Sequence, residues 1–268
     1  MKWMLKTPRG VELEEALFLA EKSGYDGAEI QLYDLPDGEE WKRNFIQTVR
    51  EFGRKGFLAA VHAPSGDLNL SSSNQGIRKE SLRQVLDTIE LAKDAGAVAV
   101  TVHPGRLSSI REKRERQYEW MKEALWEISM LAEQKKIVVG LENMENRPKE
   151  VFTFLRELNR LLDSCRNPFL GVTLDFAHLQ TVDPELDLLT LTHPVVNVHV
   201  SQCVNGVPHH SLTAEGDLPL SRCLSMLTDR GYAGTVVVEA KDNVTEAGAR
   251  ENLEVLCRAY EGSEKVRI

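Results

Sequence analysis

The chain has 268 residues, 42% of them hydrophobic and 28% charged, and its 33 Lys and Arg against 41 Asp and Glu give a formal charge of −8 at pH 7. These values are typical of a folded, soluble and mildly acidic protein. Nucleic acid is disfavoured as a partner, because an acidic surface repels phosphate backbones and the longest basic stretch runs only from Arg111 to Arg116. The length allows two ordinary domains or one α/β barrel, since single barrels commonly reach about 250 residues.

The cysteines and the N-terminus predict the compartment. Four cysteines, at positions 165, 203, 223 and 257, are widely spaced and form no C-x-x-C pair, which is typical of reduced cysteines. The N-terminal MKWMLKTPRG lacks the hydrophobic region of a signal peptide, and no apolar run approaches the roughly 18 residues of a membrane span. We therefore expect a cytoplasmic protein with no membrane partner.

Short apolar runs of β character alternate with longer segments of helical periodicity along the chain, which predicts a parallel sheet with crossover helices. After the third run, apolar residues recur every three or four positions from Ile77 to Ala92, and Gly96 ends that helix. The segments 118–131 and 249–260 repeat the pattern. The eight expected strands are Lys2 to Lys6, Gly27 to Tyr33, Phe57 to His62, Ala97 to His103, Ile137 to Glu142, Phe169 to Asp175, Val195 to Ser201 and Gly234 to Glu239.

No Pro/Gly/Ser linker and no low-complexity tract divides the chain, which weakens the two-domain alternative. Eight strand–helix units that fill the whole length form a closed ring more naturally than an open sheet. We therefore predict an α/β fold, a single (β/α)8 TIM barrel domain over residues 1–268. The segment after the seventh strand, GVPHHSLTAEGD, is expected to be a loop.

Six expected strands carry a side chain that can bind metal at their C-terminal ends. Residues two apart on a strand point to the same side of a barrel wall, and Val237 before Glu239 or Gly140 before Glu142 suits a barrel interior. The six side chains are therefore expected to converge at the C-terminal mouth, where enzymes of this shape have their active sites. They are His62, His103, Glu142, Asp175, His199 and Glu239.

A single strand-end His or Asp usually caps a helix or satisfies a loop hydrogen bond. Three carboxylates and three imidazoles aimed at one place would repel or desolvate one another without a cation, so we predict a divalent metal ion. His178 lies three residues after Asp175 and returns to the same mouth if a helix or tight loop follows that residue directly. Of His209 and His210 in the later loop, His210 is the favoured candidate.

Three basic residues beyond strand ends are candidates for holding a substrate. Arg106 follows the fourth strand, Arg147 follows the fifth, and Lys241 has the inward parity of Glu239. The alternative role for each is surface solvation or pairing with a carboxylate. One or two of them pointing inward would bind a phosphate or carboxylate on a small substrate.

The ordered motifs VHAP, VHPG, LEN, LDFAH, VHVS, H-x5-GD and VVVEA resemble the xylose isomerase-like barrel superfamily over roughly residues 25 to 242. That group contains sugar isomerases and epimerases and the endonucleases that cut DNA at abasic sites, and homo-oligomers occur in it. The resemblance to its epimerases implies that Glu142, Asp175, His199 and Glu239 hold one divalent ion, with Mn2+, Zn2+, Co2+ and Mg2+ as candidates. It also implies that the two glutamates exchange a proton with carbon on opposite faces, and that His178 contacts a substrate oxygen.

The chain departs from both branches of this group. The epimerases have an Arg where this chain has Asn205 and an acid where it has Pro148, with Glu145 and Arg147 close by. The endonucleases have an Asp where this chain has Pro208, so a one- or two-metal site is expected in place of their three-ion cluster. The positions that match endonuclease ligands are His62, His103, Glu142, Asp175, His178, His199, His210 and Glu239.

The sequence thus predicts a metal-dependent isomerase or epimerase of a small sugar, sugar phosphate or related hydroxy-carbonyl compound, acting in carbohydrate metabolism by 1,2-proton transfer through an enediolate. Two alternatives stay open. One is metal-assisted phosphodiester hydrolysis at abasic DNA, and the other is a metal-binding barrel without catalysis.

Overall fold

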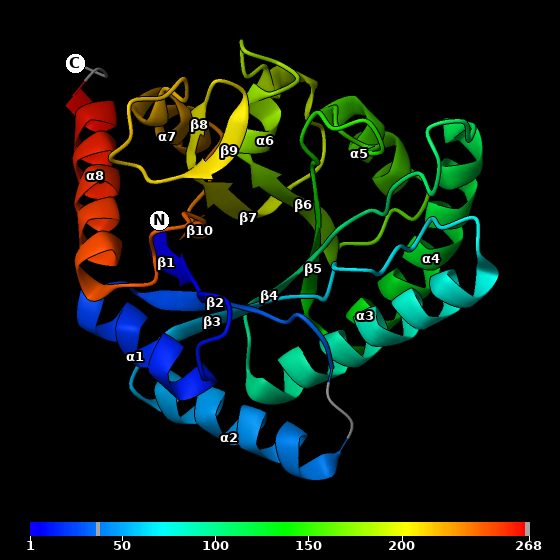
Figure 1. Ribbon diagram of the computed structural model, residues 1–268, viewed down its shortest axis with the longest axis horizontal. Helices are drawn as coiled ribbons and strands as arrows, with labels where there is room; N and C mark the ends of the chain where they lie inside the picture. Colours follow the sequence, from blue (N-terminus) through cyan, green and yellow to red (C-terminus); the bar gives the residue numbers. More distant parts are fainter. Residues whose placement is uncertain (36–37, 266–268) are drawn as a thin grey trace.

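The computed structural model describes residues 1–35 and 38–265. Eight parallel strands close into a barrel in the order β1-β10-β7-β6-β5-β4-β3-β2, and helices surround it (Figure 1). The predicted (β/α)8 TIM barrel is confirmed. None of the helices in the described part has the length and apolar character that a bilayer crossing needs.

Every expected strand is present, and the structure shortens each end by no more than two residues. The barrel strands are β1 (Lys2–Lys6), β2 (Gly27–Gln31), β3 (Leu58–His62), β4 (Ala99–Val102), β5 (Val138–Glu142), β6 (Leu170–Asp175), β7 (Val195–Val200) and β10 (Thr235–Val238). The helices are α1 (Leu13–Ser23), α2 (Glu39–Arg54), α3 (Gln75–Ala95), α4 (Arg114–Lys135), α5 (Leu155–Asp163), α6 (Phe176–Gln180), the 3-10 helix η1 (Leu188–Thr190), α7 (Leu220–Asp229) and α8 (Glu246–Lys265).

Helix α3 shows how local sequence sets these boundaries. The Asn74 side chain accepts a hydrogen bond from the backbone N–H of Gly76 at 2.8 Å, which caps the first turn. Gly96 ends the helix in the left-handed region, with φ 84°. Between these ends, Val85, Ile89 and neighbouring apolar residues are buried against the barrel, as the periodicity predicted.

The expectation of a simple loop after β7 is wrong. β8 (Gln202–Val204) and β9 (Val207–His210) pair as an antiparallel two-stranded sheet. Asn205 and Gly206 connect them, and both have positive φ, 52° and 75°, as the two-residue turn that Asn-Gly favours requires. Strands of three and four residues are too short to show alternation, but the Asn-Gly pair was a usable signal.

The barrel interior is filled in layers. Met4, Ala60 and Val237 form an apolar layer with no exposed surface. Above it Thr101 Oγ1 lies 3.1 Å from Thr173 Oγ1, so side chains from β4 and β6 meet inside the ring. A side chain at Gly140 would place its Cβ 2.2 Å from Thr173 Oγ1, which explains the glycine there. The closed interior leaves the C-terminal mouth as the place for ionisable groups.

Candidate functional site

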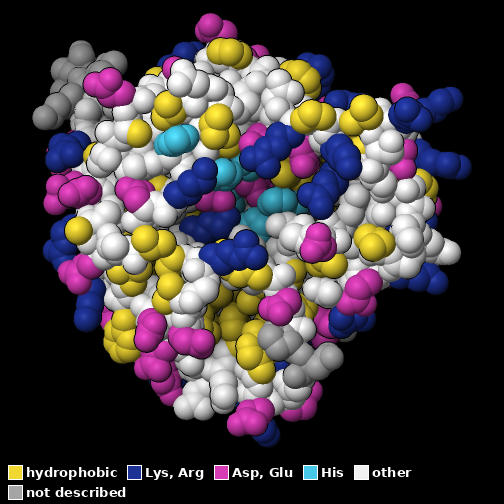
Figure 2. All heavy atoms as spheres, in the orientation of Figure 1, with side chains coloured by type: hydrophobic (Ala, Val, Ile, Leu, Met, Phe, Trp, Pro, Cys, Tyr) yellow, Lys and Arg dark blue, Asp and Glu magenta, His cyan; other side chains and the backbone are white. Residues whose placement is uncertain are grey.

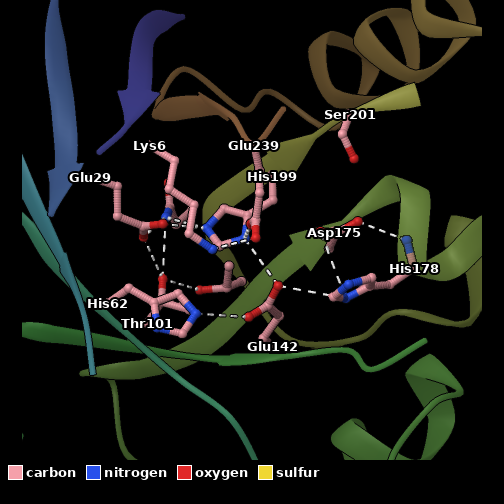
Figure 3. A network of polar contacts seen from close by, with 12 residues as sticks. Lys6, Glu29, His62, Thr101, Glu142, Asp175, His178, His199, Ser201 and Glu239 are labelled. Carbon is pink, nitrogen blue, oxygen red and sulfur yellow. Dashed lines mark hydrogen bonds and ion pairs between the residues drawn. The ribbon is translucent and has the colours of Figure 1, made fainter. Parts of the chain in front are cut away.

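A group of four possible metal ligands lies at the C-terminal mouth of the barrel. One ligand atom from each of Glu142, Asp175, His199 and Glu239 lies within 4.8 Å of the other three. His199 Nδ1 is 3.0 Å from Glu142 Oε1 and 3.1 Å from Glu239 Oε2 (Figure 3). The structure thus brings together all four residues that the sequence placed at one metal ion.

Asp175 is oriented by the start of α6. Its Oδ1 accepts a hydrogen bond from His178 N at 2.7 Å, so it is the N-cap of this helix. The Asn143 side chain exchanges two hydrogen bonds of 2.9 Å with the backbone of Asp175, and the Asn143 carbonyl contacts His178 Nδ1 at 2.9 Å. Asp175 Oδ2 remains buried without a hydrogen-bond partner among the described residues. This orphaned carboxylate oxygen fits a metal ligand, because buried polar atoms otherwise find partners.

The carboxylates of this group carry unequal pKa shifts. Burial opposes ionisation of Glu142, but His199 and His103 outweigh it and hold the pKa of Glu142 well below its usual range. Burial likewise opposes ionisation of Glu239, and the Lys6 and His199 cations again lower its pKa well below normal. Burial raises the pKa of Asp175, and the charges of Glu142 and Glu239 raise it further. A divalent cation would relieve this excess of negative charge.

Glu29 of β2 contacts the other side of His199 and was missed by the sequence analysis. His199 Nε2 lies 2.8 Å from Glu29 Oε2, while Glu29 Oε1 accepts hydrogen bonds from Thr101 at 2.8 Å and Asn197 at 2.9 Å. Burial would lower the pKa of His199, but Glu29 and Glu142 raise it well above normal. A carboxylate at Nε2 orients the ring so that Nδ1 faces the four-ligand group. The available signal was the parity of Glu29, two residues from Gly27 on the inward face.

Lys6 at the end of β1 was also missed. Its ammonium forms an ion pair with Glu239 Oε1 (Figure 3). Burial would lower the pKa of Lys6, but Glu239, Glu142 and Glu29 outweigh burial and raise it. All eight barrel strands therefore contribute to the mouth or to the layer beneath it, and not only the six with strand-end His, Asp or Glu.

Glu142 is shared with a second group, which contains His62 and His103. Its Oε2 lies 3.3 Å from His62 Nε2 and 2.9 Å from His103 Nε2. Burial lowers the pKa of His62. A lowered pKa favours the neutral imidazole, which is the form that binds metal.

A third group consists of Glu145, His178 and His209. His178 Nε2 and His209 Nδ1 are buried without hydrogen-bond partners among the described residues. His209 Nδ1 also lies 3.5 Å from Glu239 Oε1. His210 had been the favoured histidine, but it pairs with Gln202 in the hairpin and belongs to none of the three groups found in the described residues. Successive residues of a strand point to opposite sides, so only one of the pair faces the mouth.

The three predicted basic residues lie in different surroundings. Arg147 forms an ion pair with Glu145 at 2.9 Å and its side chain is 60% exposed. Arg106 is exposed, and its backbone pairs with Glu150 in an isolated antiparallel bridge. Lys241 lines a cavity of about 580 Å³ that opens over Glu239. Arg106 lines a much smaller cavity, of about 30 Å³, together with His103 of the second group.

Comparison with known proteins gives sequence relatives of more than one kind. The chain is 31% identical to the uncharacterized protein MJ1188 of Methanocaldococcus jannaschii, over 72% of each chain. It is 24% identical to L-ribulose-5-phosphate 3-epimerase UlaE of Escherichia coli, over 91% of this chain and 87% of that one. It is 28% identical to the probable endonuclease 4 of Aquifex aeolicus, over 57% of this chain and 55% of that one.

A solved structure titled D-tagatose 3-epimerase-like protein covers 100% of both chains with a TM-score of 0.88 at 24% identity, which supports the fold. The family model described as xylose isomerase-like TIM barrel matches residues 17–259. The chain therefore belongs to the xylose isomerase-like TIM barrel family.

Proposed function

We propose that the protein is a divalent-metal-dependent isomerase or epimerase of a small sugar, sugar phosphate or related hydroxy-carbonyl compound. The four-ligand group at the mouth carries this proposal, because its ligand atoms lie within 4.8 Å of one another. Three carboxylates and one imidazole suit Mn2+, Co2+, Mg2+ or Zn2+. The match over most of its length to a sugar-phosphate epimerase supports the same class of reaction.

The chemistry divides between the cation and two glutamates. When bound, a divalent cation supplies Lewis-acid stabilisation of negative charge on substrate oxygens. Glu142 on β5 and Glu239 after β10 are separated in the ring by β6 and β7, so they reach a substrate from different directions. Both carboxylates are ionised at neutral pH, because neighbouring cations lower their pKa values. One ionised glutamate would remove a proton beside the carbonyl, and the other, after taking up a proton from solvent, would deliver it to the opposite face and invert that carbon. Release of the abstracted proton to solvent would then complete the cycle.

His178 is the candidate for holding a substrate oxygen. Its Nδ1 is engaged by the Asn143 carbonyl at 2.9 Å, whereas its buried Nε2 has no hydrogen-bond partner in the described chain. A ring fixed through one nitrogen presents the other in a defined direction. Nε2 is therefore free to hydrogen-bond a hydroxyl or carbonyl of the substrate.

Hydrogen exchange tests the proposal directly. Metal-loaded protein is incubated in D2O with a panel of ketoses, aldoses and their phosphates, and deuterium uptake beside the carbonyl is followed by NMR. Glu142→Gln and Glu239→Gln should each slow exchange by about 10²–10⁴-fold, because each removes an acid–base group. Glu150→Gln, a nearby acid outside the three groups, is the control and should leave exchange unchanged.

Exchange that survives in both glutamine variants would remove their assigned roles. No uptake with any compound of the panel would instead favour a ligand-binding barrel without catalysis.

The second candidate function is metal-assisted phosphodiester hydrolysis at abasic DNA. The two additional ligand groups favour it, because one shares Glu142 with the first group and could bring a second ion close. The formal charge of −8 opposes tight duplex binding. Elemental analysis separates the two functions: about one ion per chain fits the isomerase, whereas two or more zinc ions together with cleavage of an abasic duplex fit the hydrolase.

A further inference from the structure

The cavity at the mouth extends well beyond the four-ligand group. It has a volume of about 580 Å³, and Glu239 and His209 form part of its lining. Its walls come from the C-terminal ends of β1 and β2, from the segments that follow β1, β2, β3 and β10, and from β9. These parts contribute residues 6–9, 31 and 33, 65–67, 209, 239–241 and 244. A cavity of this size accommodates a small ligand that extends from the carboxylates toward the rim.

Three cations line this cavity, and two of them have no carboxylate partner among residues 1–35 and 38–265. Lys6 is paired with Glu239. Arg9 and Lys241 are exposed, and neither forms an ion pair with any residue that the structure describes. Asp67, the other acid of the lining, is not within ion-pair distance of either. Arg9 and Lys241 therefore differ from Arg147, which is neutralised by Glu145.

Arg9 is held in position by an aromatic ring. Its guanidinium lies 4.8 Å from the centroid of Tyr33, which is itself a lining residue. A cation–π contact with the ring leaves the guanidinium N–H groups able to donate hydrogen bonds to a ligand. An arginine in this arrangement is suited to a planar or tetrahedral oxyanion.

Lys241, one of these two cations, is also close to the proposed reacting centre. Lys241 follows Glu239 by two residues, so their Cα atoms are at most about 7 Å apart. The backbone N–H of Lys241 donates to the His209 carbonyl at 3.2 Å, which ties this segment to the hairpin over the mouth. A ligand group held by Lys241 is thus only a short carbon chain away from the carboxylate of Glu239.

The charge at the mouth contrasts with that of the whole chain. The formal charge is −8, yet Lys and Arg side chains gather around the opening in which acidic and histidine atoms are visible (Figure 2). Cations at the rim of a cleft attract anionic ligands and raise their local concentration. A neutral sugar would gain hydrogen bonds from these side chains but no charge–charge attraction.

We propose that the substrate carries a terminal oxyanion, a phosphate or a carboxylate, and that Arg9 and Lys241 bind it at the rim of the cavity. This proposal rests on the proposed function for the reacting end of the substrate. The oxyanion accepts hydrogen bonds from both side chains while the carbonyl end lies against the four-ligand group. Arg9 and Lys241 are specificity-determining residues and take no part in proton transfer.

Calorimetric binding to the metal-loaded protein at constant ionic strength tests this assignment with three matched ligands. They are D-fructose, D-fructose 6-phosphate and D-fructuronate, which differ only at the end remote from the reacting carbons. Wild-type protein should bind at least one charged ligand about 10-fold or more tightly than fructose. Arg9→Gln combined with Lys241→Gln should abolish that preference and leave fructose binding within about twofold. The preferred ligand identifies phosphate or carboxylate.

The control removes two positive charges from the opposite end of the barrel, by Lys22→Gln and Arg54→Gln. It should keep the preference for the charged ligand, because these residues lie at the C-terminal ends of α1 and α2. Arg9→Lys keeps the positive charge but loses the planar guanidinium with its several donors, so it should retain part of the preference. Partial retention would show that the loss in the glutamine variant does not come from misfolding.

Equal binding of all three ligands by the wild-type protein would overturn the oxyanion site, even if deuterium exchange with fructose supported the proposed function. Equal loss of preference in the control variant would overturn it as well. A preference that depends on Arg9 and Lys241, without deuterium exchange for any ligand, would support the oxyanion site and contradict the proposed function.

Discussion

On β1, β3 and β10 the interior of the barrel has two layers of opposite character. The lower layer is apolar and has no exposed surface, whereas the upper layer consists of charged or ionisable side chains that are also largely buried. Burial of the lower layer stabilises the fold through the hydrophobic effect. Burial of the upper layer costs desolvation, which neighbouring charges outweigh at Glu142, Glu239 and His199 but not at Asp175. The paired positions are Met4 and Lys6 on β1, Ala60 and His62 on β3, and Val237 and Glu239 at β10.

Along these strands, residues two positions apart therefore have different roles. The lower residue stabilises the fold, and the upper residue contributes an ionisable group to the site. The upper layer concentrates ionisable groups where the strands end and the loops admit a ligand. We expect substitutions in the lower layer to change the free energy of unfolding without changing metal affinity. Substitutions in the upper layer should change metal affinity and have smaller effects on the free energy of unfolding.

The largest expected effect on stability comes from Met4→Ala. Removing a buried Met side chain leaves a cavity in the apolar layer and should lower the free energy of unfolding by about 2–5 kcal/mol. Urea denaturation measures this loss, and metal affinity measured on the folded variant should equal that of the wild-type protein. A large change in metal affinity would show that the two layers are coupled.

Metal binding should stabilise the folded protein, and this stabilisation should increase as the pH rises. Free metal at about 100 times its Kd stabilises a folded protein by about 2.7 kcal/mol. Without metal, Glu29 and Glu142 outweigh burial and raise the pKa of His199. Above about pH 6.5 the folded state therefore keeps the proton on His199, whereas the unfolded state loses it. The stability of the metal-free protein should therefore fall as the pH rises from about 6.5 toward the raised pKa.

A bound metal ion requires deprotonated His199, so the loaded protein escapes this loss. The rise in Tm on adding MnCl2 should consequently be larger at pH 8 than at pH 6. Thermal unfolding with and without metal at both pH values measures the difference. A rise that is the same at the two pH values would contradict the assignment of His199 as a ligand.

Glu29→Gln tests how much a side chain that orients a candidate metal ligand, without being one itself, contributes to metal affinity. Loss of the carboxylate at His199 Nε2 should lower metal affinity by about 10–100-fold, as loss of such partners does at other metal sites. Competition with a chelator measures the affinity. Thr101→Val, which removes a hydrogen bond to the same carboxylate but keeps the contact with His199, should have a smaller effect. Equal effects would mean that Glu29 acts through the packing of the polar layer.

The smallest expected effect is a gain in stability from Asp175→Asn without metal. Burial raises the pKa of Asp175, so its ionised form opposes folding, whereas an Asn Oδ1 can still accept from His178 N. The free energy of unfolding should rise by about 0.5–2 kcal/mol at neutral pH. The gain should vanish below about pH 4, where the carboxyl is protonated in both states. A loss of stability at neutral pH would contradict the view that burial of ionised Asp175 costs stability.

The strand-end residues were predictable because the relevant pattern is local. Alternation with period two places Glu142 on the same face as Gly140, and Glu239 on the same face as Val237. The structure brings both glutamates to His199, as that parity implied. The order of strands and helices was predictable for the same reason.

Glu29, Lys6 and His209 were not predictable in the same way. An acid within a strand, or a lysine at its end, is typical of a solvated surface, and only closure of the ring places Glu29 against His199 and Lys6 against Glu239. Of the adjacent His209 and His210, the register of a short hairpin and a positive φ of 67° at His209 decide which one faces the mouth.

Sequence alone determined the succession of eight strand–helix units and the chemical type of the residues at the strand ends, because both depend on periodicities of a few residues. The tertiary structure decided which nitrogen of His199 faces which carboxylate, and how two of the three ligand groups share Glu142. It also decided which cations lack an ion-pair partner among the described residues. These depend on distances between residues far apart in the chain, and such distances exist only once the barrel has closed.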